Sequence, residues 1–434
     1  MSATGSPFGN ASLVRFERPA ARQAREPIRL PRIWARCSFL DEEIPQSRDE
    51  RMKLRLVEFL ICPCCKADRP LRLESFKTET LVLTDADLQR CEAMSIKPET
   101  VSHVIVDGVL CCDECKTWYP IKNRTAIMHR FEHALHRSFA QEFGSRSSVF
   151  KELHPPQGEA WPGEKTTMRN YTKTWETIGE GELTFHFNHE QLKRYYRGLL
   201  DYPEWVLTRK NLSVLDVGVG FGYEAKNLRS VIDGEVFGVD LNLSQLQSSH
   251  IFDKDPFLHL FCCSLFEIPL RKKSFDVVVS IGVLHHTVST KQAVHSIVSH
   301  MKDDGMVLIW VYSTEDFGED IPRVVLRLRE LLVRPVLSRM PMWIQNPIMY
   351  TFALLQYPYD KQTVPNPDQW KLKNTLGHLR DRYTPVYAHR HLASHPYQWL
   401  DEIGMDGRNI DEMKFKNEVG FWHFGITVRG TKRV

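Results

Sequence analysis

Two pairs of closely spaced cysteines are the clearest chemical feature of this sequence. Cys62 and Cys65 stand in "CPCC", and Cys112 and Cys115 stand in "CDEC". Two residues between cysteines let both thiolates of one turn reach the same ion, and two such turns complete a tetrahedral four-sulfur site. The spacing therefore predicts one Zn²⁺ held by these four cysteines. Four thiolates leave no position open for water, which favours a structural ion over a catalytic one.

Other interpretations of these cysteines stay open. Cys64 and Cys111 each adjoin a proposed ligand and could replace it, although the spacing favours the outer set. Free buried cysteines or redox-active pairs are further alternatives. Clustered cysteines in a long and otherwise ordinary chain indicate metal binding in a reducing compartment more than a disulfide framework.

A glycine-rich turn follows the first of several apolar runs. The segment "VLDVGVGFG" contains Asp216, Gly218, Gly220 and Gly222. Glycines permit a tight turn and let a cofactor approach the backbone. The spacing G-x-G-x-G differs from the pyrophosphate-binding G-x-G-x-x-G, and an acid before the first glycine suits a cofactor with a cationic amino-acid part. Asp240, about one strand and helix later, is placed to accept the hydroxyls of a ribose.

Imidazole and phenol groups gather in two places where a base could act. His285 and His286 follow the fourth apolar run, and "DRYTPVYAHRHL" contributes Tyr387, His389 and His391. Histidine is the natural base near neutral pH. Methyl transfer from a sulfonium needs mainly alignment and sometimes the removal of a proton. These five residues are the candidate catalytic groups, and a purely structural role is the alternative for each histidine.

The elements that must position these groups follow from the apolar pattern. Short apolar runs alternate with helical stretches from 212 to 312: "SVLDVGV", "EVFGVDL", "LHLFCCS", "FDVVVSIGV" and "GMVLIWVY". This pattern predicts a Rossmann-like α/β domain, a buried parallel sheet with helices on both faces. We expect a zinc module over 52–125, a helical connector over 126–205, and the α/β domain over 206–434, with a helical insertion over 320–395 as a lid. Residues 1–51 form an arginine-rich leader that is disordered, a targeting segment or untranslated.

Composition narrows the class of protein. The chain has 434 residues and a net charge of only +3, which argues against a nucleic-acid partner. It has no apolar run long enough for a transmembrane helix, and a cytoplasmic protein is expected. The basic amphipathic stretch 322–357 fits a lid over an apolar or membrane-surface substrate, or a plain pair of packed helices.

Two resemblances sharpen this picture. "LICPCCKADRPL" and "DGVLCCDECKTWYPI" resemble the small zinc-binding protein that activates several eukaryotic tRNA, rRNA and protein methyltransferases. Residues 206–315 resemble class I methyltransferases of the group that includes ubiquinone and menaquinone C-methyltransferases. The second resemblance implies S-adenosylmethionine as cofactor in place of NAD.

The same resemblance implies roles for individual residues. Asp216 and Gly218 would lie near the methionine end of the cofactor, and Asp240 with Leu241 near its ribose. The adenine would be flanked by Ser264, Leu265 and Phe266, and the sulfonium side would be lined by Ile281 and Gly282. Many relatives have Asp where Ser264 stands, to bind the adenine amino group; a serine hydroxyl can make the same bond without a charge, which implies a tuned affinity and not a lost site.

These observations predict an S-adenosylmethionine-dependent methyltransferase that acts on a small molecule, a lipid or a glycan. One alternative is a tRNA or rRNA methyltransferase. The sequence lacks an Asn-Pro-Pro-Tyr signature of base methylation, which argues against this alternative. A methyltransferase fold that binds the cofactor without catalysis and assists another enzyme is the second alternative.

Overall fold

The computed structural model describes most of the chain from Met52 onward. The described residues are 52–179, 183–184, 187–201, 203–248, 255–314, 328–364, 366–419 and 425–433. The expected leader 1–51 and the first part of the expected insertion, 320–327, lie outside them. Among the described residues, no helix is both long and apolar enough to cross a membrane.

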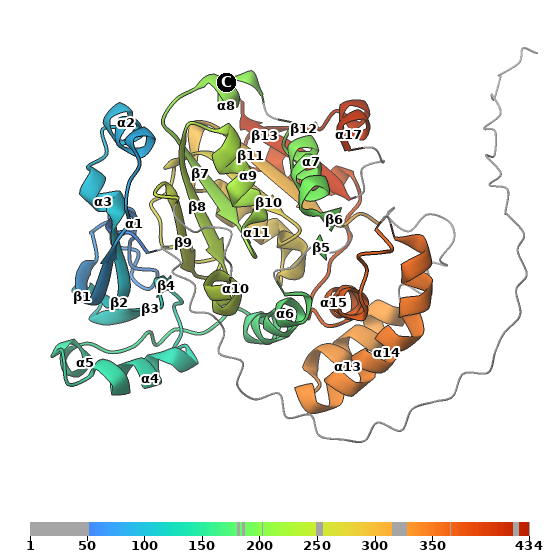
Figure 1. The fold of residues 1–434 in the computed structure, drawn as a ribbon, viewed down its shortest axis with the longest axis horizontal. Helices are drawn as coiled ribbons and strands as arrows, with labels where there is room; N and C mark the ends of the chain where they lie inside the picture. Colours follow the sequence, from blue (N-terminus) through green and yellow to red (C-terminus); the bar gives the residue numbers. More distant parts are fainter. Residues whose placement is uncertain are drawn as a thin grey trace, which may run out of the picture. The chain divides into compact units, whose positions relative to one another are not determined.

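One sheet runs through the whole described chain (Figure 1). Its strands, in spatial order, are β1 (Arg72–Thr80), β2 (His103–Cys112), β3 (Thr117–Lys122), β4 (Thr125–Ile127), β9 (Leu258–Cys262), β8 (Gly234–Asp240), β7 (Leu212–Val217), β10 (Phe275–Ile281), β11 (Met301–Val311), β13 (Ile426–Lys432) and β12 (Met405–Asn409). Strands β5 (Leu183–Thr184) and β6 (Phe187–Asn188) form a separate hairpin. The five apolar runs are thus strands β7 to β11, and the predicted Rossmann-like fold is confirmed.

The helices fall into three groups along the chain. Those before the α/β domain are α1 (Leu54–Val57), α2 (Asp85–Ala93), α3 (Pro98–Ser102), α4 (Ala134–Phe143), α5 (Val149–Glu152), α6 (Glu164–Ile178), α7 (His189–Leu200) and α8 (Glu204–Thr208). Those within its repeating part are α9 (Tyr223–Val231), α10 (Leu243–Ser248), η1 (Leu284–His286) and α11 (Thr290–Val298). The later ones are η2 (Arg329–Val333), α13 (Arg334–Arg339), α14 (Met342–Thr363), α15 (Leu372–Tyr383), α16 (Ser394–Asp401) and α17 (Glu412–Val419).

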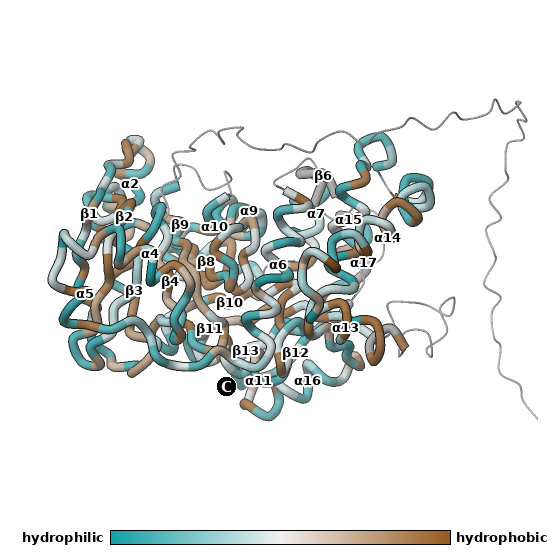
Figure 2. The backbone as a smooth tube through the Cα atoms, turned by 90° about the horizontal axis from the view of Figure 1, so that it is seen from below, coloured by the Kyte–Doolittle hydropathy of each residue, from teal (hydrophilic) through white to brown (hydrophobic). Residues whose placement is uncertain are grey.

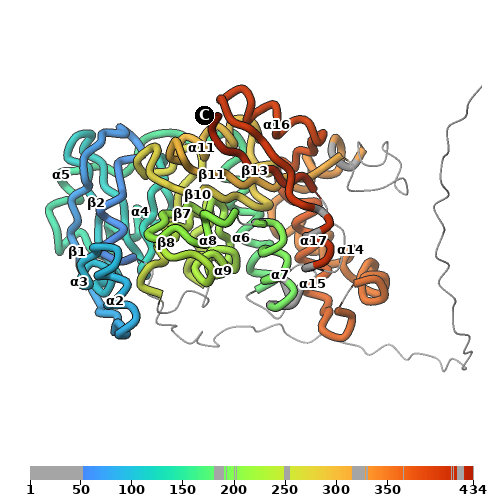
Figure 3. Tube along the Cα trace, turned by 90° about the horizontal axis from the view of Figure 1, so that it is seen from above, coloured from blue at the N-terminus to red at the C-terminus, as the bar shows by residue number. Residues whose placement is uncertain are grey.

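The central strands are buried on both faces, as their continuous apolar runs predict. On one face, side chains of α11 and α16 pack against β7, β8, β10 and β11. On the other face, side chains of α8, α9 and α10 complete a second core. Figure 3 shows these two helical layers with the strands between them, and Figure 2 shows the apolar residues concentrated in the strands.

The cysteine-containing segment adds its own strands to this sheet. Strand β4 pairs in parallel with β9, through Ala126 opposite Phe261 and Ile127 opposite Cys262. The backbone N–H of Met128 continues the pairing to the carbonyl of Cys262 at 2.7 Å. The buried Lys53 side chain donates to the carbonyl of Leu258 at 2.8 Å. The boundary expected near residue 125 stays a prediction, but hydrogen bonds cross it.

Helix α6 joins the segment before the α/β domain to the later helices. It lies between α10 and α15 (Figure 1). The buried Asn170 amide donates to the carbonyls of Ser338 and Thr384, at 2.8 and 2.7 Å. A side chain on Gly377 of α15 would meet Ile178 of α6 at 2.3 Å, so glycine permits the close approach of the two helices. The insertion thereby holds α6 over the carboxyl ends of the central strands.

Candidate cofactor and metal sites

The glycine turn after β7 has a backbone that only glycine adopts easily. Gly218, Gly220 and Gly222 all have positive φ, at 86°, 53° and 79°. A Cβ on Gly218 would lie 2.1 Å from a methyl group of Val283. The turn therefore packs directly against the segment that follows β10, and it leaves room for a ligand only because side chains are absent.

Asp240, at the end of β8, holds this turn in place. One carboxylate oxygen accepts the backbone N–H of Gly220 at 2.9 Å, and the other accepts the backbone N–H of Asn242 at 2.8 Å. The side chain is almost fully buried at 9% exposure, yet it also borders the open pocket. A carboxylate has lone pairs beyond these two bonds, so Asp240 retains capacity for a ligand hydroxyl.

A pocket opens at the carboxyl ends of β7, β8, β9 and β10, where ligands bind in open α/β sheets. From the α/β domain it is lined by Val217, Gly218, Gly220, Val239, Asp240, Leu241, Asn242, Cys263, Leu265, Phe266, Gly282, Val283, His286, Thr287 and Val288. From other segments it is lined by Trp161, Pro162, Glu164, Thr167, Tyr171, Trp175 and Tyr387.

The structure brings most of the predicted cofactor residues to this pocket. At least one residue from each predicted group, those for the glycine turn, the ribose, the adenine and the sulfonium, lines the pocket. Asp216, Gly222, Ser264 and Ile281 are not among the lining residues, although each adjoins or lies near one that is. Asp216 is buried at the base of the glycine turn, and Ser264 lies behind Phe266, whose backbone N–H it accepts at 3.2 Å.

Two buried carboxyl groups beside the glycine turn have oxygens without hydrogen bonds. Neither oxygen of Asp216 has a hydrogen bond, and one oxygen of Glu224 also lacks one, among the described residues. Burial and the neighbouring Asp240 raise the pKa of Asp216 to about 8. Burial and Asp216 raise the pKa of Glu224 as well. Unpaired buried carboxyl groups are costly, and a cationic ligand group such as an ammonium would satisfy them. The donor set thus fits the amino-acid part of S-adenosylmethionine.

Sequence reasoning missed the wall that α6 and the preceding loop contribute. Trp161, Glu164, Tyr171 and Trp175 all face the pocket. The rings of Trp161 and Phe266 pack with centroids 4.5 Å apart. The aromatic residues of this region were visible in the sequence, but their spacing fits any amphipathic helix and does not reveal a ligand.

Of the five predicted catalytic groups, His286 and Tyr387 line the pocket. The Nδ1–H of His286 donates to the carbonyl of Tyr387 at 2.8 Å, which leaves Nε2 as an acceptor. Burial lowers the pKa of His286 to about 4, so the imidazole is neutral at pH 7. Tyr387 contacts Gly163, where an added Cβ would lie 2.6 Å from its ring.

The other three candidates lie outside the pocket walls. His285 is fully buried and its ring lies 3.8 Å from that of Tyr312. The side chain of His389 bonds to the carbonyl of Thr287 at 3.0 Å, and that of His391 to the hydroxyl of Thr290 at 2.9 Å. These bonds join the segment after α15 to the segment after β10, and they position His286 and Tyr387.

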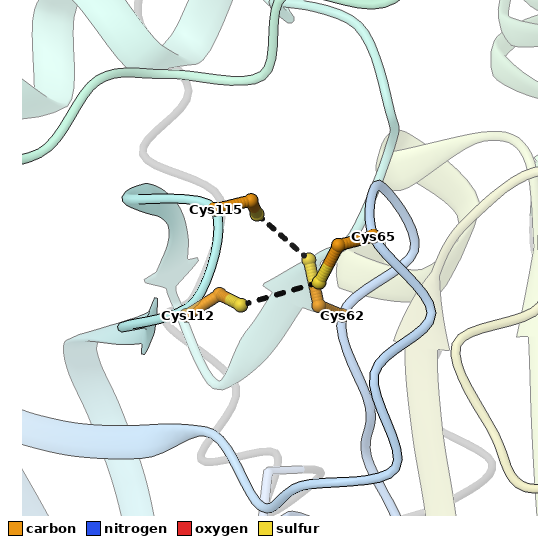
Figure 4. A group of neighbouring side chains, drawn as sticks. All are labelled: Cys62, Cys65, Cys112 and Cys115. Atoms are coloured by element: carbon orange, nitrogen blue, oxygen red, sulfur yellow. Dashed lines mark hydrogen bonds between the residues drawn. The ribbon is translucent and has the colours of Figure 1, made fainter.

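The four predicted zinc ligands lie together at one end of the β2–β3 hairpin (Figure 4). Their sulfur atoms all lie within 4.8 Å of one another, with Cys62–Cys115 at 3.5 Å and Cys65–Cys112 at 3.6 Å. Tetrahedral Zn²⁺ with sulfur ligands requires about 3.8 Å between sulfurs. The outer set of the two CxxC pairs therefore has the geometry of a four-thiolate site.

The two alternative cysteines are not members of this four-sulfur group, although the thiol of Cys64 interacts with that of Cys62. Cys111 is buried in an apolar cluster with Val109 and Trp118. Cys64 is exposed, with its sulfur 3.8 Å from the carbonyl of Arg130.

The loop that carries Cys62 and Cys65 also contacts the segment after β9. Glu267 forms ion pairs with Lys66 at 2.8 Å and with Arg130 at 3.2 Å. The backbone N–H of Ile61 donates to the carbonyl of Pro269 at 2.9 Å. Glu267 follows directly on the pocket residues Leu265 and Phe266, so the cysteine site supports one wall of the pocket.

Strand order, glycine turn and pocket together define a class I methyltransferase fold, of the kind that binds S-adenosylmethionine. A family model described as a methyltransferase domain matches residues 215–309, and one described as Trm112p-like protein matches residues 53–123. The chain thus combines a methyltransferase domain with a Trm112p-like zinc-binding module.

Several curated relatives share one name. A "tRNA U34 carboxymethyltransferase" of Geobacter sp. (strain M21) is 28% identical over 139 residues, 31% of this chain and 43% of the relative. A "Ubiquinone biosynthesis O-methyltransferase" of Rickettsia typhi is 25% identical over 143 residues, 31% of this chain and 54% of the relative. A solved complex that contains the Haloferax volcanii Trm112 methyltransferase activator overlaps 64% of this chain and 100% of that chain, at 13% identity and a TM-score of 0.37. The chain thus spans about half the length of these two curated relatives.

These relatives correct two expectations. The expected small-molecule, lipid or glycan acceptor was wrong, and so was the expectation that a nucleic-acid partner is disfavoured, because at least five curated relatives are named for the modification of tRNA. The net charge misled because it sums over the entire chain and does not report a local binding surface. The absent Asn-Pro-Pro-Tyr signature excludes only one type of base methylation.

Proposed function

We propose that this protein is an S-adenosylmethionine-dependent methyltransferase whose acceptor is RNA, with tRNA as the substrate class. The pocket and the buried, unpaired carboxyl oxygens of Asp216 and Glu224 beside its glycine turn support the cofactor, since an ammonium would satisfy these oxygens. The names of the relatives support the acceptor. We further propose that Cys62, Cys65, Cys112 and Cys115 hold one structural Zn²⁺, which their mutual distances support.

The chemistry of the pocket favours transfer of a methyl group over a carboxymethyl group. A carboxymethyl donor carries a carboxylate on the transferred carbon and would need a cation beside it. Among the described residues that line the pocket, none is lysine or arginine. The aromatic rings of Tyr171, Trp175 and Tyr387 instead suit the positive charge of a sulfonium. When bound, the cofactor supplies an electrophilic methyl group on sulfur, and the protein aligns the acceptor with it.

His286 is the group we assign to the acceptor side. It lines the pocket with its Nε2 available as an acceptor, since Nδ1 donates to the carbonyl of Tyr387. A neutral imidazole there would accept a hydrogen bond from the N–H or O–H of the acceptor and orient its lone pair toward the methyl group. Tyr387 closes the pocket beside it.

We expect His286→Gln to lower kcat by about 10²-fold, the usual contribution of a positioned acid–base group. Affinity for S-adenosylhomocysteine, measured by calorimetry, should change little. Because burial lowers the pKa of His286 to about 4, the wild-type rate should stay constant as pH falls to about 5, where a free histidine would already be protonated. His103→Gln, at the start of β2, is the matched control. An acid limb with an apparent pKa near 6.5 would contradict this assignment.

The proposed function is tested by offering the purified full chain S-adenosylmethionine labelled in its methyl group, together with either total tRNA, total rRNA or an extract of lipids and metabolites. We expect the labelled methyl group in the tRNA fraction, and ribonuclease digestion of that fraction should release the label. Mass spectrometry of the nucleosides should then show a methyl and not a carboxymethyl addition. Label confined to the lipid and metabolite fraction would contradict the RNA acceptor, and label in rRNA alone would contradict tRNA.

A further inference from the structure

The adenine end of the pocket lacks the acid expected at Ser264, and a different acid occupies the neighbouring space. Glu164 is the first residue of α6 and lines the pocket. One of its carboxylate oxygens accepts the backbone N–H of Trp161 at 3.0 Å, which fixes the direction of the side chain. The Ser264 hydroxyl lies within hydrogen-bonding reach of the same carboxylate. The carboxylate thus lies beside the position that an aspartate at 264 would occupy.

Ser264 itself has little capacity for a ligand. Its Oγ already accepts the backbone N–H of Phe266 at 3.2 Å, and its hydroxyl lies near the Glu164 carboxylate, whose pKa it lowers. The serine side chain is 2% exposed and is not part of the pocket wall. A carboxylate accepts several hydrogen bonds at once, so Glu164 retains acceptor capacity beyond Trp161 and Ser264.

The surroundings make this carboxylate selective for its partners. The packed rings of Trp161 and Phe266 lie in the same wall of the pocket, and partial burial raises the pKa of Glu164 despite the nearby Arg130. A ligand group that donates a hydrogen bond to this carboxylate is favoured. A ligand group that is itself an acceptor is disfavoured, because two acceptors facing each other away from water leave both without a hydrogen bond.

We propose that Glu164 is the base-specificity residue of the cofactor site, and that its carboxylate accepts the exocyclic amino group of adenine in place of the missing acid at position 264. The recognition element then comes from a helix that precedes the methyltransferase domain in the chain. Ser264 acts as a positioning residue that orients the Glu164 carboxylate. This inference rests on the proposed use of an S-adenosyl cofactor, but not on the RNA acceptor.

The test compares two ligands whose bases differ at C6 and at the adjoining N1, which carries a proton only in the inosyl ligand. S-adenosylhomocysteine carries an amino group at C6, and S-inosylhomocysteine carries a carbonyl oxygen. By calorimetry on the full chain, we expect the wild type to prefer the adenosyl ligand by about tenfold or more, the scale of a hydrogen bond to a charged group. Glu164→Gln should remove most of this preference, because an amide can donate to the carbonyl of the inosyl ligand. Glu176→Gln, an exposed position of the same helix, should keep the preference.

The other possible outcomes contradict either the role of Glu164 or the proposed cofactor. Equal affinity of the wild type for both ligands overturns the role of Glu164 but leaves the cofactor site standing. A Glu164→Gln variant that loses both ligands equally shows that Glu164 only holds the loop, and this also overturns the proposal. If neither ligand binds the wild type, the proposed cofactor itself is wrong. Glu164→Asp, which keeps the charge, should keep the preference at lower affinity.

Discussion

We expect replacement of Cys112 with serine to release the proposed zinc ion and to cause a large loss of stability. Structural zinc sites contribute on the order of 10 kcal/mol to the folding of small zinc modules. The loss should lower the melting temperature of the full chain by about 10 °C or more. Affinity for S-adenosylhomocysteine should fall as well, because the cysteine loop holds Glu267 and Pro269, next to the pocket wall.

The matched control is Cys64→Ser, an exposed cysteine in the loop of the other pair, between Cys62 and Cys65. It should retain one zinc per chain by metal analysis and melt like the wild type. Loss of zinc in Cys64→Ser together with retention in Cys112→Ser would show that the ligand set is wrong. Removal of the ion from the wild type with a chelator should reproduce the Cys112→Ser phenotype, which separates the effect of the metal from that of the side chain.

The second large effect is expected for Asp216→Asn, which should weaken cofactor binding but increase the stability of the ligand-free protein. Asp216→Asn removes the negative charge that would face the ammonium of the cofactor. Removing one partner of a buried ion pair weakens affinity by about 10²- to 10³-fold. Calorimetry with S-adenosylhomocysteine, which keeps the same ammonium, measures this loss. An affinity equal to that of the wild type would show that the ammonium binds elsewhere.

Without ligand, the same substitution should stabilise the protein at alkaline pH. Burial and Asp240 raise the pKa of Asp216 to about 8, against an ordinary value of about 3.8. Between these values the unfolded chain releases the proton while the folded chain keeps it, so the free energy of unfolding falls as pH rises. The asparagine side chain of the variant has no such proton to lose. We therefore expect the variant to exceed the wild type in stability at pH 8 by a few kcal/mol, with a difference that shrinks toward pH 4. A variant less stable than the wild type at pH 8 would contradict the unpaired state of Asp216.

Local patterns were predictable from the sequence because their physical causes are local. The strands of the α/β domain follow from apolar runs, and the turn at Gly218 follows from the need for a backbone without Cβ. The four cysteines lie where their spacing places them, because a turn of two residues brings both thiolates to one point.

The far wall of the pocket was not predictable, because it depends on contacts between distant segments. Glu164 lies near Ser264 in a helix, α6, that is bonded to Ser338 of α13 and to Thr384 after α15. No spacing within either segment reveals this. The two neighbouring histidines show the same limit. His286 lines the pocket and His285 packs in the interior, since consecutive side chains of a short helical turn point in different directions.

The pairing of β4 with β9 has a consequence for synthesis on the ribosome. The cysteine segment emerges first, and with zinc it has the local contacts to fold at once. Its strand β4 nevertheless has an unpaired edge until β9, more than a hundred residues later, has been translated. An open strand edge invites pairing with other nascent chains. Strand β4 has only three residues, Thr125–Ile127, which keeps this edge short during the delay.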